Sequence, residues 1–489
     1  MCERLLVWIA AEASVEHEEL RAAGHRAVDW IVDYLEGIEA RRVLPDVRPG
    51  ELRSRLPEHP PEHGEPTGRW LDDFERLIVP GMTHWQHPGW MAYFPSNTSA
   101  PSLLGEMLAA GMGAQCMSWQ TSPAATELEQ VVMDWLRQLL GLPPDFTGVL
   151  QDTASSSTLV ALLAARERAT GFGFASDGAR APGADRLVVY ASEEAHSSVE
   201  KGVRLAGYGQ SALRRLPTDD ALALRVDALE HAMARDVAAG LAPACVVATA
   251  GTTSTSAFDP LQAVAEACRR HGAWLHVDGA YGGVAGLLPE KRALLAGLEH
   301  ADSFVVNPHK WLLTHFDCSA FFVRDPAHLV RVFSTSPEYL KTAVDDQVVN
   351  FRDWGIPLGR RFRALKLWFV LRAYGAEGLR AFLRNHVALA ADLAARLDAH
   401  PDFERLAPAP LGLVCFRYRP AGVAADDPRL DGWNARLLEA VNASGRVFVT
   451  STRVRGRLAL RASIGQRTTA ARHVDDLWAL LVASRPSDC

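Results

Sequence analysis

Several residues that could do chemistry stand directly after short apolar runs of the sequence. His196 follows "RLVVYAS", Thr253 follows "PACVVATAG", Asp278 ends "AWLHVD", and Asn307 and Lys310 follow "DSFVV". A lysine amine is a nucleophile toward carbonyl groups, an imidazole transfers protons, and an aspartate stabilises a protonated ring nitrogen. Each residue alone is more simply explained as a turn residue or a helix cap. An acid, an imidazole, a hydroxyl and a lysine at successive run ends instead indicate one reactive site.

A second group lies in "GVLQDTASSSTLVALLAARERA", where Ala154 and Ser155 open a strong helical pattern. The free N–H groups and the dipole of a helix start attract an anion, although plain N-capping explains the hydroxyls equally well. The Walker pattern GxxxxGK[ST] is missing. A phosphate site, a lysine among apolar neighbours and a strand-end aspartate together indicate pyridoxal 5′-phosphate (PLP). A lysine holds this cofactor as a Schiff base, and an aspartate keeps its pyridine nitrogen protonated.

The elements that must position these residues follow from the pattern around them. From about Gly148 to Asp325, short β-branched runs alternate with helical stretches, which predicts an α/β domain with a mainly parallel sheet covered on both faces. Ligands bind outside the carboxyl ends of such strands, so we expect the residues after each run to face one cleft. Residues 386–400 predict a helix. "GLVCFRYRP", "RVFVTS", "RLALRAS" and the helical "TTAARHVDDLWALLVAS" predict a smaller α+β domain.

The N-terminal part has a different character. Residues 15–40 predict an amphipathic helix, with Ala27, Trp30 and Tyr34 at helical spacing, and the proline-rich residues 41–66 predict an extended connector. Because this piece has few partners of its own, we expect its apolar stripe to pack on another part of the protein or on a second subunit.

Composition excludes several classes of function. The 489 residues, 48% hydrophobic and 22% charged, are typical of a soluble globular protein of two or three domains. The net charge of -7 and the lack of a Lys/Arg-rich run argue against nucleic acid, and no run approaches the roughly 20 apolar residues of a membrane span. Seven scattered cysteines without a CxxC pair argue against disulfides and against a metal site, and they favour the reducing cytoplasm.

Seven longer blocks carry a family resemblance. They are, in chain order, "HWQHPGWMAYFPS", "SWQTSPAATELE", "EEAHSSVEKG", "HVDGAYGG", "NPHKWLLTHFDCSAFFV", "SPEYLK" and "IPLGRRFRALKLWFVLRAYG". Over nearly its whole length the chain resembles the group II PLP-dependent decarboxylases, and most closely the aromatic-L-amino-acid decarboxylases. The resemblance implies the PLP-dependent transferase fold of the aspartate aminotransferase type (fold type I). It divides the chain into an N-terminal helical dimerisation segment (1–91), a large PLP-binding domain (92–380) and a small C-terminal domain (381–489). It also implies a homodimer with its active site at the subunit interface.

The resemblance assigns roles to individual positions. Lys310 matches the lysine that carries the cofactor, Asp278 the partner of its ring nitrogen, Ala280 the small residue under the ring and His196 the imidazole stacked above it. The remaining matches are Ala154, Ser155 and Asn307 at the phosphate, Thr253 in the cofactor pocket, and Trp85, Tyr93, Ser96, His196 and Gly359 around the substrate.

Tyr339, in "SPEYLK", matches the tyrosine of a mobile catalytic loop that reaches the active site of the other subunit. Relatives that form aldehydes typically have phenylalanine here, or asparagine in place of the stacked histidine. Both Tyr339 and His196 are of the decarboxylase type, so the expected reaction converts an aromatic L-amino acid to its amine and CO2. The expected catalytic residues are Lys310, Tyr339, His196 and Asp278.

The resemblance leaves the substrate open among tryptophan, 5-hydroxytryptophan, dopa, tyrosine and phenylalanine. Gly359 stands where relatives preferring indole or broad aromatic substrates have glycine, but Gln115 and Met117 depart from the apolar pattern of animal relatives. Trp311 and the "HWQHP" block favour the aromatic branch. Decarboxylases of histidine, glutamate or 2,4-diaminobutyrate, an aromatic aldehyde synthase, and a silent cofactor-binding protein stay as alternatives.

Overall fold

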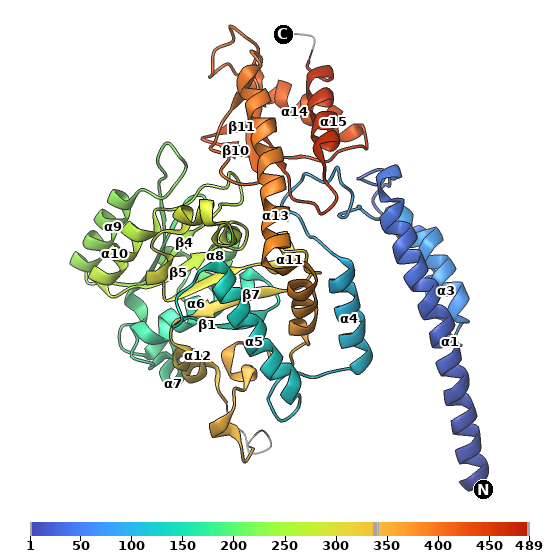
Figure 1. Cartoon of the computed structure of the whole chain (residues 1–489). Helices are drawn as coiled ribbons and strands as arrows, with labels where there is room; N and C mark the ends of the chain where they lie inside the picture. Colours follow the sequence, from blue (N-terminus) through green and yellow to red (C-terminus); the bar gives the residue numbers. More distant parts are fainter. Residues whose placement is uncertain (1, 336–339, 341, 487–489) are drawn as a thin grey trace.

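The computed structural model describes the backbone of residues 2–335, 340 and 342–486, and the side chains from Glu16 onward within those ranges. Three parts are visible in Figure 1: a central sheet wrapped by helices, a smaller domain above it, and a long N-terminal helix beside the body. No helix of the described ranges is both long enough and apolar enough to cross a membrane.

The central sheet has seven strands in the order β1-β7-β6-β5-β4-β2-β3. Neighbouring strands are parallel except for β7, which is antiparallel to both β1 and β6. The strands are β1 (Thr147–Gln151), β2 (Leu187–Ser192), β3 (Leu213–Leu216), β4 (Ala242–Thr249), β5 (Trp274–Asp278), β6 (Ser303–Val306) and β7 (Ser319–Val323). The predicted mainly parallel α/β fold is therefore confirmed. Only β3, a short and partly exposed strand at the sheet edge, escaped the sequence pattern.

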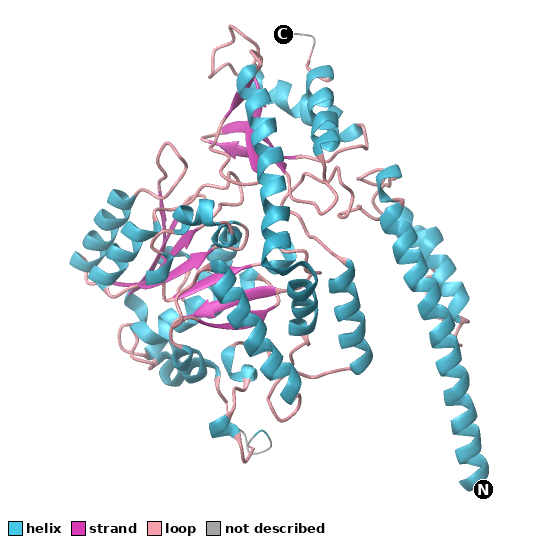
Figure 2. Ribbon diagram, viewed as in Figure 1, coloured by secondary structure: helices cyan, strands magenta, loops and turns pink. Residues whose placement is uncertain are grey.

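Burial on both faces explains why the central strands read as continuous apolar runs. Along β2, Val188 and Tyr190 belong to one core cluster, whereas Val189 and Ala191 belong to the cluster on the opposite face. The first face is covered by α5 (Pro123–Leu140), α9 (Val226–Ala238), α10 (Leu261–His271) and the first half of α13 (Arg363–Ala399). The second face is covered by α6 (Ala154–Ala169), α8 (Ser197–Leu205) and α12 (Pro326–Phe333). The result is the layered arrangement of helix, sheet and helix drawn in Figure 2.

The two domains share one helix. α13 packs on α4 (Ala100–Met112) and α5 with its first part, and on the small domain with its second. Gly375, at φ 61°, interrupts its helical geometry. The predicted helix at 386–400 is thus the end of a much longer element, and the expected domain division at residue 380 falls inside it.

The small domain is an antiparallel sheet of four strands in the order β10-β11-β9-β8, with two helices. Its elements are β8 (Phe403–Arg405), β9 (Leu413–Tyr418), α14 (Arg429–Ala443), β10 (Thr450–Val454), β11 (Arg457–Ser463) and α15 (Ala471–Ala483). β10 begins later than "RVFVTS" predicts, because Phe448 pairs instead with Trp90 in an isolated bridge.

The N-terminal helix α1 (Cys2–Glu36) starts well before the predicted residue 15 and lies beside α3 (Thr67–Asp73). Trp30 of α1 stacks on Tyr34, with ring centroids 5.1 Å apart, and meets Phe74 edge-on at 4.9 Å. The predicted extended connector contains one short helix, α2 (Glu51–Arg55). Two further short α-helices are α7 (Phe174–Asp177) and α11 (Pro308–Trp311).

Candidate active site

The carboxyl ends of β4, β5 and β6 open into a cavity of about 210 Å³. All eight residues predicted to bind the cofactor line this one cavity, although they come from segments spread over more than 150 residues: Ala154, Ser155, His196, Thr253, Asp278, Ala280, Asn307 and Lys310. The parallel strands explain this convergence, because the segments that follow β1, β2, β4, β5 and β6 all leave the sheet at the same edge.

Lys310 stands on α11, directly after β6. Its Nζ lies 4.9 Å from the centroid of the Phe94 ring, and among the described residues no carboxylate forms an ion pair with it. Burial lowers the pKa of this amine from 10.5 to about 8, opposed by the Asp278 carboxylate and helped by Arg461. At pH 7 roughly one amine in ten is therefore neutral, far more than for a lysine in water. A lysine in this state is a competent nucleophile for a carbonyl carbon.

Asp278 is buried at the end of β5, in register with Thr249 of β4. Its Oδ1 accepts a hydrogen bond of 3.0 Å from the backbone N–H of Ala280, and the carbonyl of Ala280 accepts one of 3.1 Å from the N–H of Asn307. Asn307 Oδ1 in turn accepts a 2.7 Å hydrogen bond from the hydroxyl of Ser319. These bonds hold the carboxylate, the small residue and the amide in fixed relative positions on one wall of the cavity.

The N-terminus of α6 faces the same cavity. Its N-cap, Thr153, has extended backbone angles, and among the described residues no side chain caps this end of the helix. The first N–H groups of a helix have no intrahelical partner, so an uncapped start calls for an anion. Ala154 and Ser155 leave room for it because their side chains are small. The N-terminus of α6 suits a phosphate group. In the same cavity, Lys310 suits a carbonyl compound and Asp278 suits a protonated ring nitrogen.

A second compartment of about 530 Å³ adjoins the first and shares His196, Thr253 and Lys310 with it. The predicted substrate residues Trp85, Tyr93 and Ser96 all line it. Its wall is strongly aromatic, since Phe94 and Phe316 join Trp85 and Tyr93 there. The inner compartment suits a cofactor and the outer one an aromatic side chain.

Two predicted residues lie elsewhere. Gly359 sits on an exposed loop, where a Cβ would stand 3.1 Å from the side-chain nitrogen of Gln115. Gln115 Oε1 also accepts a 2.7 Å hydrogen bond from the backbone N–H of Arg360. Tyr339 lies outside the described residues, so its role stays a prediction.

Sequence reasoning missed Arg461. This residue comes from β11 of the small domain and is buried. Its Nη2 donates to the carbonyls of Tyr93 (2.9 Å) and Thr253 (2.8 Å), and so ties the outer wall to the inner one. The sequence does contain a signal for this role, because Arg461 stands at an inward position of "RLALRAS". An arginine is rarely buried without carbonyls or carboxylates that accept its hydrogen bonds, so such a position indicates contacts with another segment.

His309 and Trp311 flank Lys310; His309 lines both compartments, whereas Trp311 has a packing role. His309 Nδ1 accepts a 2.9 Å hydrogen bond from the N–H of Cys318, its ring lies against Phe316, and burial lowers its pKa to about 3. Trp311 is fully buried, stacks on Tyr281 and donates to His386 Nδ1 at 3.1 Å. The preference for the aromatic branch that we drew from Trp311 is thus a matter of resemblance and not of substrate contact.

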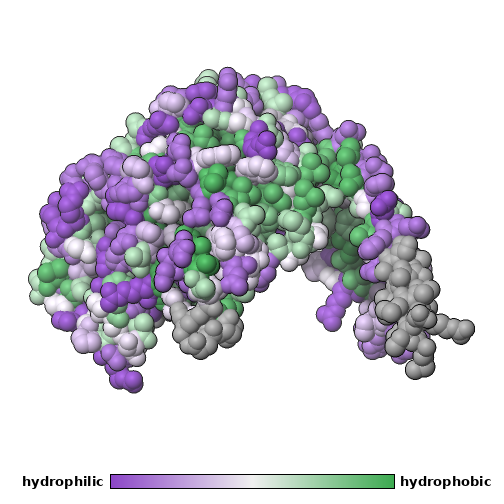
Figure 3. Space-filling view, turned by 60° about the horizontal axis from the view of Figure 1, so that its bottom comes forward, coloured by the Kyte–Doolittle hydropathy of each residue, from purple (hydrophilic) through white to green (hydrophobic). Residues whose placement is uncertain are grey.

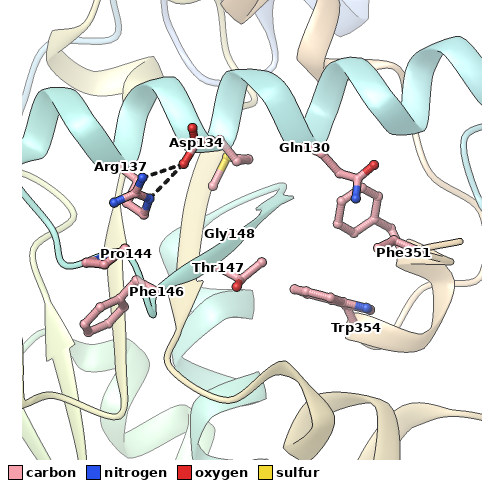
Figure 4. A pocket seen from close by; sticks show the side chains of 11 residues that line it. Gln130, Asp134, Arg137, Pro144, Phe146, Thr147, Gly148, Phe351 and Trp354 are labelled. Carbon is pink, nitrogen blue, oxygen red and sulfur yellow. Dashed lines mark hydrogen bonds and ion pairs between the residues drawn. The ribbon is translucent and has the colours of Figure 1, made fainter.

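A third hollow, of about 170 Å³, lies between α5, the start of β1 and residues 349–354. Figure 4 shows Arg137 turned onto Asp134 of the same helix, opposite Phe351 and Trp354. The two hydrogen bonds between this pair are 2.9 and 2.6 Å long. Arg137 and Asp134 therefore satisfy each other's hydrogen bonds. The hollow shares no described residue with the Lys310 cavity, so we place the candidate active site at the Lys310 cavity.

Comparison with known proteins agrees with this geometry. Residues 49–419 match the pyridoxal-dependent decarboxylase conserved domain. The phenylacetaldehyde synthase of Arabidopsis thaliana is 44% identical over 477 residues (96% of each chain), and the aromatic-L-amino-acid decarboxylase of Bos taurus is 44% identical over 472 residues (94% of each). The crystal structure of Oryza sativa TDC with PLP and tryptamine superposes with a TM-score of 0.92 at 40% identity and covers 96% of this chain and 97% of that one.

The cavity and these relatives lead to the same assignment. Lys310, Asp278 and the start of α6 line one cavity and have the chemistry that could hold PLP, and the similarity spans nearly the full length of both the chain and its relatives. The chain therefore belongs to the pyridoxal-dependent decarboxylase family and is a PLP-dependent carboxy-lyase.

Proposed function

We propose that the protein decarboxylates aromatic L-amino acids to the corresponding amines. The observation that carries this proposal is the outer compartment. Its walls hold Trp85, Tyr93, Phe94 and Phe316, and among the described residues lining it no aspartate, glutamate or arginine is present. An aromatic side chain gains stacking and burial there. Lys310 is the one lysine among the described lining residues, and in the proposed reaction it is taken up by the cofactor, so the side-chain carboxylate of glutamate would lose water without a dedicated arginine or lysine to receive it.

In this reaction the carboxylate leaves as CO2 and a proton takes its place on Cα. Bound PLP supplies an electron sink for the electron pair that the broken bond leaves behind. Asp278 holds the proton on the ring nitrogen, which keeps that sink electron-poor. Lys310 would hold the cofactor, and its Nζ would accept a proton once the substrate amine is bound. Phe94 and Trp85 orient the substrate ring and exclude water from the cavity.

The competing outcome is an aldehyde, because both kinds of enzyme occur among the relatives: a phenylacetaldehyde synthase of Arabidopsis thaliana and a 4-hydroxyphenylacetaldehyde synthase of Rhodiola rosea stand beside the decarboxylases. We favour the amine because His196 and Tyr339 are both of the decarboxylase type. In the proposal Tyr339 donates the proton that Cα receives, and His196 holds a hydrogen bond in the cleft.

We further propose a homodimer with its active site at the interface. α4 and the pair α1/α3 stand opposite each other in Figure 1, and Figure 3 shows apolar residues on the inner side of the arch between the body and the N-terminal helices. Leu104, Leu108 and Met112 of α4 are 53%, 54% and 59% exposed, and Trp70 of α3 is 54% exposed. Exposed apolar side chains that gather on one face are typical of a protein–protein interface. The free thiols of the buried cysteines among the described residues favour a reducing, cytoplasmic setting.

One assay tests the proposed reaction. The purified PLP-loaded protein is offered tryptophan, 5-hydroxytryptophan, dopa, tyrosine and phenylalanine, with glutamate, histidine and 2,4-diaminobutyrate beside them, and both CO2 and the organic product are measured. We expect CO2 and an equal amount of amine from at least one aromatic substrate, and neither from the Lys310→Ala variant. Turnover of glutamate alone, or aldehyde in place of amine, contradicts the proposal.

Sedimentation at several protein concentrations tests the dimer.

A further inference from the structure

The ring of His196 is held by an unusual helix cap. His196 is the N-cap of α8, and its Nδ1 accepts the backbone N–H of Ser198 at 3.2 Å. The hydroxyl Oγ of Ser198 lies 2.8 Å from the same nitrogen. N-caps are normally serine, threonine, aspartate or asparagine. A histidine in this place therefore gives the cap a second consequence, because the capping atom is a titratable ring nitrogen.

The direction of these contacts fixes the position of the ring proton. A backbone N–H can only donate, so the nitrogen that faces it must offer a lone pair. A proton on Nδ1 would point at that N–H and break the cap. A neutral imidazole carries one N–H, and with Nδ1 excluded it resides on Nε2. Ser198 is 5% exposed, so its hydroxyl has little access to water as an alternative partner to Nδ1.

We propose that Ser198 is a positioning residue that holds His196 as the Nε2–H tautomer, so that the imidazole presents a hydrogen-bond donor to the active-site cleft. The inference rests on the proposed function, since it specifies what His196 does in that reaction. It goes beyond the stacking role expected from the family resemblance, because it names the atom of His196 that holds the proton and the residue that keeps it there.

The surrounding charges support a neutral ring. Burial lowers the pKa of His196, and the charges that face it are Asp278 from β5, which raises this pKa, and Lys310 from α11 and Lys201 from α8, which lower it. The N–H groups at the start of α8 add a positive partial charge beside Nδ1. A second proton on the ring is therefore unfavourable at neutral pH.

This arrangement limits the proton transfers that His196 can perform. If Nε2 gave its proton to Cα, the neutral ring would become an imidazolate, or Nδ1 would take a proton from the Ser198 hydroxyl and leave an alkoxide. Among the described contacts of Nδ1 and Ser198 no cation stabilises either anion. His196 thus donates a hydrogen bond without losing its proton. The proton that Cα gains must come from another group, which agrees with the role proposed for Tyr339.

The tautomer can be read directly by ¹⁵N NMR of PLP-loaded protein labelled at histidine, with the His196→Asn variant identifying the signal. We expect a protonated Nε2 and an unprotonated Nδ1 in the parent protein. Ser198→Ala removes the hydroxyl and keeps the amide, so the Nδ1 resonance should move. Ser198→Thr keeps both donors and should restore it. A protonated Nδ1 in the parent, or an Nδ1 resonance that Ser198→Ala leaves unchanged, overturns the proposal.

Kinetics give a second readout. Loss of one hydrogen bond to the ring should lower kcat of Ser198→Ala roughly three- to tenfold with KM little changed, and Ser198→Thr should recover most of it. Ser197→Ala, at the exposed neighbouring position, is the matched control and should behave as the parent. An Ala variant with parental kcat contradicts the positioning role. The NMR result does not depend on the substrate, so a failure of the proposed function leaves the tautomer test intact.

Discussion

The lowered pKa of Lys310 predicts that this residue destabilises the protein when no cofactor is bound. Each pKa unit corresponds to about 1.4 kcal/mol, so a fall from 10.5 to about 8 costs about 3 kcal/mol as an upper value, since the side chain is partly open to the cavity. The folded protein binds this proton less tightly than the unfolded chain does. The cost is therefore full below pH 8, shrinks between pH 8 and 10.5, and vanishes above that range.

Lys310→Met keeps the length of the side chain and removes its charge. In cofactor-free protein at one fixed concentration, denaturant unfolding should show the variant to be more stable than the parent at pH 7, by up to about 3 kcal/mol, with a difference that narrows toward pH 10.5. Lys201→Met, at an exposed position of α8, is the control and should show no such narrowing. Equal stabilities of parent and Lys310→Met at pH 7, or a difference that is constant with pH, would refute the reasoning.

Three other predictions concern the site and its support. Asp278→Asn should lower kcat/KM by on the order of 10²–10³, the size of other electrostatic deletions, while circular dichroism stays unchanged; near-parental turnover would exclude the assigned role. Tyr339→Phe should convert part of the amine product to aldehyde, ammonia and peroxide, and an unchanged amine yield would remove Tyr339 from the chemistry. Gly279→Ala would bring a Cβ to 2.5 Å from the Phe304 ring and should lower the free energy of unfolding by about 1–3 kcal/mol. The control is Gly111→Ala on α4, where a Cβ meets open space, and this change should be neutral or stabilising. Similar effects of the two changes would rule out the steric explanation.

The central sheet and its reactive edge could be predicted from the sequence because both follow from local patterns. Strands buried on both faces are apolar throughout, so β2, β4, β5 and β6 can be recognised in the sequence as apolar runs. The residues after each run then lie at the ligand-binding edge of the sheet. Lys310 and Asp278 stand at the ends of such runs, so the local pattern alone indicates them. The same logic fails for β3, whose "LRRL" lies at the sheet edge and is only partly buried.

The residues that sequence reasoning missed are those whose role depends on contacts between distant segments. Arg461 lies in the small domain, 151 positions after Lys310, yet its hydrogen bonds join Tyr93 to Thr253. Ser198 resembles any serine in the first turn of a helix until the ring of His196 is placed against it. Neither role has a signature in spacing or periodicity, because the chain brings the partners together only through the packing of two domains or the turn of one loop.

The same distinction bears on substrate choice. Gly359 matches the glycine of relatives that prefer indole or broad aromatic substrates, and glycine leaves space beside its backbone, although Gly359 does not line the outer compartment. In the folded chain that space is bordered by the amide of Gln115, 3.1 Å from where a Cβ would stand and anchored on the N–H of Arg360. A serine at 359 would have to displace this amide or bond to it. The effect of residue 359 on selectivity therefore depends on Gln115. A Gly359→Ser exchange should change the ratio of kcat/KM between indole and phenol substrates only slightly while Gln115 is present. The same exchange should change that ratio more when Gln115 is replaced by isoleucine.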